Sequence, residues 1–182
     1  RKSMILTMEE KKLTAIHEGG HALVAYHTKG ADPVHKITII PRGRSLGATA
    51  QLPDEKHGYP KKYLLGRLDI LMGGRVAEKL IFNDISTGAG NDISVATDIA
   101  RQMVTEWGMS DKIGPLAFGQ DNDNVFLGRE VVRTRHISDE ISQTIDQEIT
   151  KLVLDAETNA GRIIKKHLEE LNRIADALLE FE

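Results

Sequence analysis

The segment Met8–His27, MEEKKLTAIHEGGHALVAYH, carries the strongest structural signal in the chain. Its small and apolar residues recur mostly at steps of three and four, which predicts an amphipathic helix; these residues are Leu13, Ile16, Gly20, Leu23 and Val24. Thr7 stands immediately before the segment, and Glu9 and Glu10 lie in what would be its first turn. This arrangement is typical of a capped helix N-terminus, so we expect the helix to begin near Met8.

Within this helix, His17, Glu18 and His21 form the pattern H-E-x-x-H. Residues four apart on a helix share one face, with Cβ atoms about 5–6 Å apart, so two imidazoles there can bind one zinc ion at roughly 2.0–2.1 Å each. Glu18 could then take a proton from a water molecule that zinc activates. Gly19 and Gly20 each cost a helix interior about 1 kcal/mol relative to alanine, which indicates that another group approaches the backbone closely. The pattern alone also fits two ordinary helix histidines.

A catalytic zinc site needs a third protein ligand and an open fourth position. The chain has no cysteine, so that ligand must be a histidine, an aspartate or a glutamate. Glu78, in a predicted helix, and Asp92, after the glycine-containing loop 86–90, are the candidates. Glu78 fits equally well as a solvated helix charge, and Asp92 as an acid favoured by the helix macrodipole. Residue chemistry alone leaves both candidates open.

The rest of the chain alternates short strand patterns with longer helix patterns. The strand patterns occupy residues 35–40, 46–52, 116–118 and 125–127. The helix patterns occupy residues 60–82, 91–107, 138–158 and 160–179. We therefore predict a mainly α fold with a small β-hairpin or sheet near the active site and a C-terminal helical hairpin. The length of 182 residues fits a single domain, which could divide into a catalytic part over residues 1–110 and a helical part over residues 111–182.

Composition and charge exclude several classes of function. A net charge of -3 and a pI near 6.2 argue against a nucleic-acid partner. No apolar run approaches the ~20 residues of a membrane span, and no signal peptide opens the sequence. Because the sequence begins at Arg1 rather than at methionine, we expect a fragment of a longer protein, with any membrane anchor outside it.

Seven further motifs follow H-E-x-x-H along the chain. They are DPVHK (32–36), IIPRG (39–43), LG (46–47), GGRVAE (73–78), STGAGND (86–92), WGMS (107–110) and VFLGR (125–129). With these motifs in this order, the chain resembles the peptidase domain of the FtsH-type ATP-dependent, membrane-anchored zinc metalloproteases over nearly its whole length. That family usually has alanine at the position of Gly19, a departure that spares every expected ligand and the base.

The resemblance implies that His17, His21 and Asp92 hold one Zn²⁺ per chain and that Glu18 is the general base. It leaves Glu78 a supporting role beside the site, and His35, which lies in a matching motif, could also assist. The implied activity is endopeptidase cleavage of unfolded or membrane-extracted proteins, with a strand over residues 46–52 accepting an extended substrate by β-addition.

The resemblance also implies a homo-hexamer, with an ATPase module and a membrane anchor outside this chain. The expected location is a bacterial inner membrane or an organelle membrane, with this part facing the cytoplasm or the matrix. The chain has no G-x-x-x-x-G-K-[ST] phosphate loop, so we do not expect it to hydrolyse ATP. The alternative function is a catalytically silent zinc-binding or helical oligomerisation module, which Glu18 argues against because a purely structural zinc site needs no base.

Overall fold

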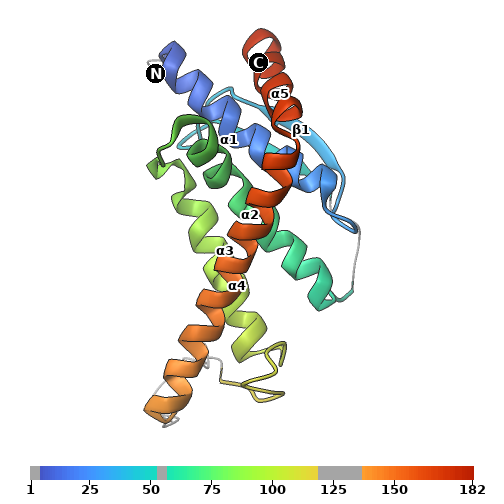
Figure 1. Cartoon of the computed structure of the whole chain (residues 1–182), viewed down its shortest axis with the longest axis vertical. Coiled ribbons are helices and arrows are strands. Elements are labelled where there is room, and N and C mark those ends of the chain that lie inside the picture. Colours follow the sequence, from blue (N-terminus) through green and yellow to red (C-terminus); the bar gives the residue numbers. More distant parts are fainter. Residues whose placement is uncertain (1–4, 53–56, 119–136) are drawn as a thin grey trace, which may run out of the picture.

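A computed structural model describes residues 5–52, 57–118 and 137–182 of the chain. The elements are, in order, α1 (Met8–His27), β1 (Val34–Thr38), β2 (Ala48–Gln51), α2 (Lys61–Phe82), the 3₁₀ turn η1 (Thr87–Ala89), α3 (Gly90–Thr105), α4 (Asp139–Lys166) and α5 (Leu168–Phe181). The predicted mainly α fold with a small two-stranded sheet is thereby confirmed (Figure 1). No helix among the described residues combines the length and the apolar character needed to cross a bilayer.

The helix α1 begins and ends where its sequence pattern predicts. Thr7 Oγ accepts the Glu10 N–H at 3.2 Å, and the Thr7 N–H donates to the Glu10 carboxylate at 2.7 Å. This reciprocal capping box satisfies two backbone donors that a helix end otherwise leaves free. Every residue from Thr14 to Ala25 is buried, so α1 is the central helix of the fold rather than a surface helix.

The helices α1 and α2 cross with their backbones in contact. A Cβ added to Gly20 would lie 2.4 Å from the carbonyl oxygen of Gly73, and one added to Gly73 would lie 2.8 Å from the carbonyl oxygen of Gly20. Only glycine therefore fits at either position. This explains why α1 tolerates a glycine at its centre despite the conformational cost, and it brings the middle of α2 directly over the two histidines.

The strands β1 and β2 form an antiparallel pair, with Ile37 opposite Thr49. Each strand is shorter than its sequence pattern, because the continuous pairing covers only residues 34–38 and 48–51, and the connecting segment closes with an isolated bridge between Arg42 and Ser45. The pair lies beside α1 (Figure 1), and the Thr49 hydroxyl oxygen lies 3.0 Å from the Glu18 carbonyl oxygen. The sheet is therefore tied to the part of α1 that carries the H-E-x-x-H pattern.

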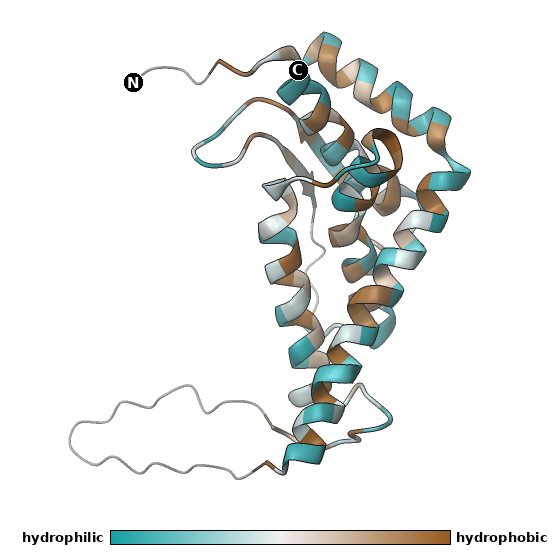
Figure 2. Ribbon diagram, turned by 60° about the vertical axis from the view of Figure 1, so that its left-hand side comes forward, coloured by the Kyte–Doolittle hydropathy of each residue, from teal (hydrophilic) through white to brown (hydrophobic). Residues whose placement is uncertain are grey.

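The C-terminal helices differ in detail from the expected hairpin. The helix α4 continues past residue 159 to Lys166, and only His167 separates it from α5. The continuation is favourable because Ala160 and Ile164 are fully buried and Gly161 faces α2, where a Cβ added to it would lie 3.6 Å from Val76 Cγ1. The two helices form a bent pair (Figures 1 and 2), and the apolar face of α5 packs on α1 rather than along α4.

The helices are amphipathic, and the segment after α3 forms no strand. Figure 2 shows apolar and polar residues alternating along the helices, as expected for helices that bury one face. Residues 116–118 form no strand; instead the Phe118 N–H donates to the Thr105 carbonyl at 2.7 Å. The partner strand expected over residues 125–127 lies outside the described residues.

Candidate metal centre

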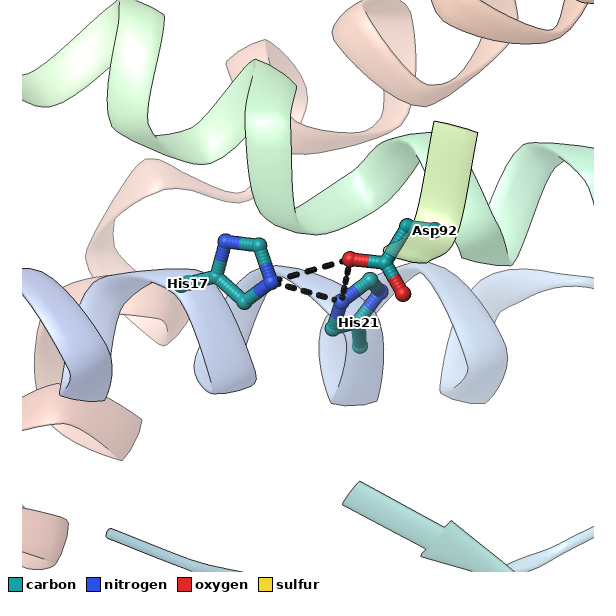
Figure 3. Close-up of side chains that lie close together, drawn as sticks. All are labelled: His17, His21 and Asp92. Carbon is teal, nitrogen blue, oxygen red and sulfur yellow. Dashed lines mark hydrogen bonds and ion pairs between the residues drawn. The ribbon is translucent and has the colours of Figure 1, made fainter. Parts of the chain in front are cut away.

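Three potential ligand atoms from α1 and α3 meet at one point (Figure 3). The Nε2 atoms of His17 and His21 lie 3.0 Å apart, and Asp92 Oδ2 lies 3.1 Å from the first and 3.2 Å from the second. A tetrahedral zinc ion with bonds of about 2.0–2.1 Å separates its ligand atoms by roughly 3.3–3.4 Å. The observed triangle is close to that size, so the three side chains fit a single small cation.

The far side of each imidazole shows where its proton lies. His21 Nδ1 is 2.7 Å from the Ile70 carbonyl oxygen, so a neutral His21 donates from Nδ1 and leaves Nε2 bare. His17 Nδ1 faces the Glu78 carboxylate at 3.6 Å, and this favours the same tautomer. Two bare nitrogens and one carboxylate oxygen then face one another with no hydrogen to share. Such a group of electron pairs is stabilised by a cation between them, which a divalent metal or a proton can supply.

Without a metal, protons compensate part of this charge. Burial lowers the pKa of His17, but its hydrogen bond with Asp92 and the nearby carboxylates of Glu78 and Glu18 raise it more, to about 9. Burial raises the pKa of Asp92, yet its bonds with His17 and His21 hold it well below its ordinary value. The pKa of Glu78 is also lowered, because the bonds from His17 and Ser86 outweigh its burial. A metal ion therefore competes with a proton on His17.

Gly74 of α2 forms the wall of the cluster, a role that the sequence did not reveal. A Cβ placed on Gly74 would lie 2.6 Å from His17 Nε2 and 2.7 Å from His21 Nε2. Any side chain at this position would enter the space between the imidazoles. The motif GGRVAE signals this position only as a glycine that interrupts a helix, since its neighbours across space come from another segment.

Glu18 lies beside the cluster and contacts the sheet. Its side chain is buried, and its Oε2 accepts the hydroxyl of Thr49 at 2.7 Å. Gly47 leaves room for this arrangement, because a Cβ there would lie 2.9 Å from Glu18 Cγ. The Thr49 hydroxyl thus fixes one carboxylate oxygen of Glu18. Sequence reasoning did not single out Thr49, whose partner is 31 residues away in the chain.

Glu78 lies behind the cluster and not in it. One carboxylate oxygen faces His17, and the other accepts the hydroxyl of Ser86 at 2.6 Å. Ser86 Oγ also accepts the Gly88 N–H at 3.2 Å in the loop that leads to α3. Glu78 therefore links His17 to the loop that places Asp92 in the first turn of α3.

His35 is not brought to the cluster. It lies exposed on β1, where it lines a groove between β1 and α5. Of the six residues singled out from the sequence, the structure thus brings His17, His21 and Asp92 together, with Glu18 and Glu78 adjacent in the chain or in space.

Comparison with known proteins agrees with this geometry. The family model of peptidase family M41 matches residues 4–182. The protein named "ATP-dependent zinc metalloprotease FtsH" from Pelodictyon phaeoclathratiforme is 49% identical over 183 residues, which cover 100% of this chain and 28% of the relative. Proteins with the same name from Myxococcus xanthus and Caulobacter vibrioides are 48% and 51% identical, again over 100% of this chain and over 29% and 30% of the relatives. The chain therefore spans less than a third of the length of these curated relatives.

Proposed function

The chain belongs to peptidase family M41, and from this premise we propose that it is the zinc-dependent endopeptidase part of a longer protease. The observation that carries the proposal is the meeting of His17 Nε2, His21 Nε2 and Asp92 Oδ2, with their lone pairs facing one another next to Gly74. Two imidazoles and one carboxylate are the donor set of a catalytic zinc site, which keeps its fourth position for water or substrate.

In this proposal His17, His21 and Asp92 hold one Zn²⁺. A bound zinc ion supplies a Lewis acid that polarises the peptide carbonyl and lowers the pKa of water from about 15.7 toward about 7. The protein's own contribution begins with Glu18, which accepts a proton from the attacking water and passes it to the leaving amine. The Thr49 hydroxyl donates to the Glu18 carboxylate and so orients it, and the Glu78 carboxylate lies 3.6 Å from His17 Nδ1, on the side of the ring away from the cluster.

The sheet offers a place for an extended substrate. Within the described part of the chain, β2 pairs with β1 alone, so its second edge has unpaired backbone groups. A peptide that adds to this edge gains main-chain hydrogen bonds that do not depend on its sequence. Because Thr49 belongs to β2 and contacts Glu18, a peptide bound there would lie close to the base. Unfolded polypeptides are therefore the substrate class that we propose.

The remaining assignments concern the longer protein. We propose that it also contains an ATPase module and a membrane anchor and that it assembles as a homo-hexamer. The name of the relatives, ATP-dependent zinc metalloproteases, supports the ATPase module, and the short share of their length that this chain covers leaves room for further parts. The anchor and the hexamer rest on the family resemblance. A catalytically silent zinc or oligomerisation module would have no use for a buried glutamate beside its metal ligands, so Glu18 favours the enzyme.

The test is the variant Glu18→Gln with a short, flexible fluorogenic peptide as substrate, because such a peptide needs no unfolding. We expect Glu18→Gln to retain one zinc ion per chain by elemental analysis and to lose at least 100-fold in kcat, the range of effect of a general base. Glu9→Gln, an exposed change on the same helix, is the matched control and should leave kcat unchanged. Full peptide cleavage by Glu18→Gln would refute the assigned base, and a wild-type chain that binds no zinc would refute the metal site.

A further inference from the structure

A second group of metal-ligating side chains lies where three helices meet. His27 is the last residue of α1, His167 joins α4 to α5, and Glu170 lies in the first turn of α5. His27 Nε2 donates to one Glu170 oxygen at 2.8 Å, and His167 Nδ1 donates to the other at 3.1 Å. One ligand atom from each residue lies within 4.8 Å of the others. We propose that these three residues form a second, solvent-accessible zinc site that ties α1 to the junction of α4 and α5.

The donor set and the protonation of the group suit a transition metal. Two imidazoles and one carboxylate are ligands that zinc accepts, and the pair His167 and Glu170 has the i, i+3 spacing that puts both on one helix face. Among the described residues, neither imidazole has a hydrogen-bond partner at its second nitrogen. The proton that each ring now donates to Glu170 can therefore move to that second nitrogen, which leaves the facing lone pair for the metal.

The rings must turn to bind an ion between them, which breaks the stacked arrangement of the metal-free fold. In the absence of metal they stack with centroids 3.7 Å apart and planes 11° apart, so their lone pairs do not yet point to one place. The torsion that turns an imidazole about its Cβ–Cγ bond is broad. The side chains of His27 and His167 are 23% and 22% exposed, and that of Glu170 is 37% exposed, so water and metal can reach the group.

The local field also favours a cation. His27 ends α1 and His167 caps the C-terminus of α4, so two helix C-termini with partial negative charge meet at this point, against one N-terminus with partial positive charge, that of α5. Glu169 and Glu170 add carboxylates in the first turn of α5. The pKa of Glu170 is lowered mainly by its bond with His27, which keeps the carboxylate ionised. The nearby Lys165 and Lys166 line the groove between α2 and α4 instead.

Metal binding at this site would strengthen the docking of α5. That helix packs on the back of the H-E-x-x-H turn, since a Cβ on Gly19 would lie 3.2 Å from Leu171 Cδ1 and 3.3 Å from Ile174 Cγ2. The second site shares no ligand with the first, so each can be removed while the other is kept. Its existence does not depend on the proposed peptidase activity.

The experiment titrates Zn²⁺ into the chelator-stripped chain by isothermal calorimetry. We expect two binding events per chain in the wild type, and we expect His167→Gln and Glu170→Gln to weaken only the second event, by at least tenfold. Glu180→Gln, an exposed change further along α5, is the matched control and should keep both events. His17→Gln should weaken only the first event, which separates the two sites.

Imidazole NMR resonances give a second readout that does not depend on variants. We expect the ring signals of His27 and His167 to shift during the second equivalent of zinc and those of His17 and His21 during the first. A wild-type chain that binds a single zinc ion would overturn the proposal. So would a second binding event that survives both His167→Gln and Glu170→Gln, or a second equivalent that leaves the His27 and His167 rings unmoved.

Discussion

Replacement of Gly74 by alanine is the sharpest test of the metal centre. The added methyl carbon would lie 2.6 Å from His17 Cε1 and Nε2 and 2.7 Å from His21 Nε2. Ordinary contact begins near 3.4 Å, so the methyl group is about 0.7–0.8 Å too close to both rings. The backbone of α2 is held against α1 at Gly20 and Gly73, so the imidazoles must move instead.

The expected loss follows from the precision that zinc requires. Metal–ligand distances tolerate changes of about 0.2 Å, several times less than the displacement that the methyl group imposes. Loss of a single group that only supports a ligand typically costs 10–100-fold in metal affinity. Because Gly74→Ala displaces two ligands at once, we expect zinc affinity to fall by more than about 100-fold, or roughly 2.8 kcal/mol.

The assay is a competition of the purified chain with a fluorescent zinc chelator, and circular dichroism checks that the variant is folded. Gly161→Ala is the matched control, because its Cβ would lie at an ordinary 3.6 Å from Val76 Cγ1 inside α4. It should leave zinc affinity unchanged and raise the free energy of unfolding by up to about 1 kcal/mol. A folded Gly74→Ala chain that binds zinc within threefold of the wild type would refute the reasoning.

Two further predictions concern the same cluster. The pKa of His17 is raised from 6.5 to about 9 in the metal-free fold, so its stabilising contribution should be complete below pH 6.5 and lost as the pH rises through about 9. In denaturant titrations of the chelator-treated chain, the free energy of unfolding should be lower at pH 9.5 than at pH 6. In the His17→Gln variant this drop should be smaller. Thr49→Val should lower kcat on a short peptide about tenfold with little change in KM, whereas Thr49→Ser, which keeps the hydroxyl, should have the kcat of the wild type. Equal kcat in Thr49→Val and wild type would rule out a positioning role for the hydroxyl that contacts Glu18.

The parts of the fold that depend on local chemistry could be predicted from the sequence. The bounds of α1 follow from the Thr7 cap and from the spacing of its small and apolar residues, both of which act within one or two turns. The C-terminal break could not be placed in this way. Asn159, Ala160 and Gly161 look like a helix end in isolation, but α2 covers Ala160 and Gly161, and the helix continues to Lys166.

In the candidate site, too, the residues related by local spacing could be predicted and those brought together by tertiary packing could not. His17 and His21 share a face by helix geometry alone, so their pairing was accessible from spacing. The choice between Glu78 and Asp92 was not, because both reach the histidines through tertiary packing; the structure puts Asp92 in the cluster and Glu78 behind His17. Their roles as ligand and support stay predictions. Thr49 and Gly74 escaped notice because each acquires its meaning from a segment more than 30 residues away.

The position of α5 has a practical consequence for anyone who alters this protein. Leu171 and Ile174 of α5, a helix of 14 residues, pack against the turn of α1 that carries Glu18. Glu182, which follows α5, pairs with Lys11 in the first turns of α1 at 2.5 Å. Truncating, tagging or cross-linking α5 would therefore disturb the candidate metal centre from behind α1, although no residue of α5 belongs to that centre. A loss of activity after such a change would show that α1 had lost the packing of α5 against it. It would not show that the histidines of α1 had lost their chemical role.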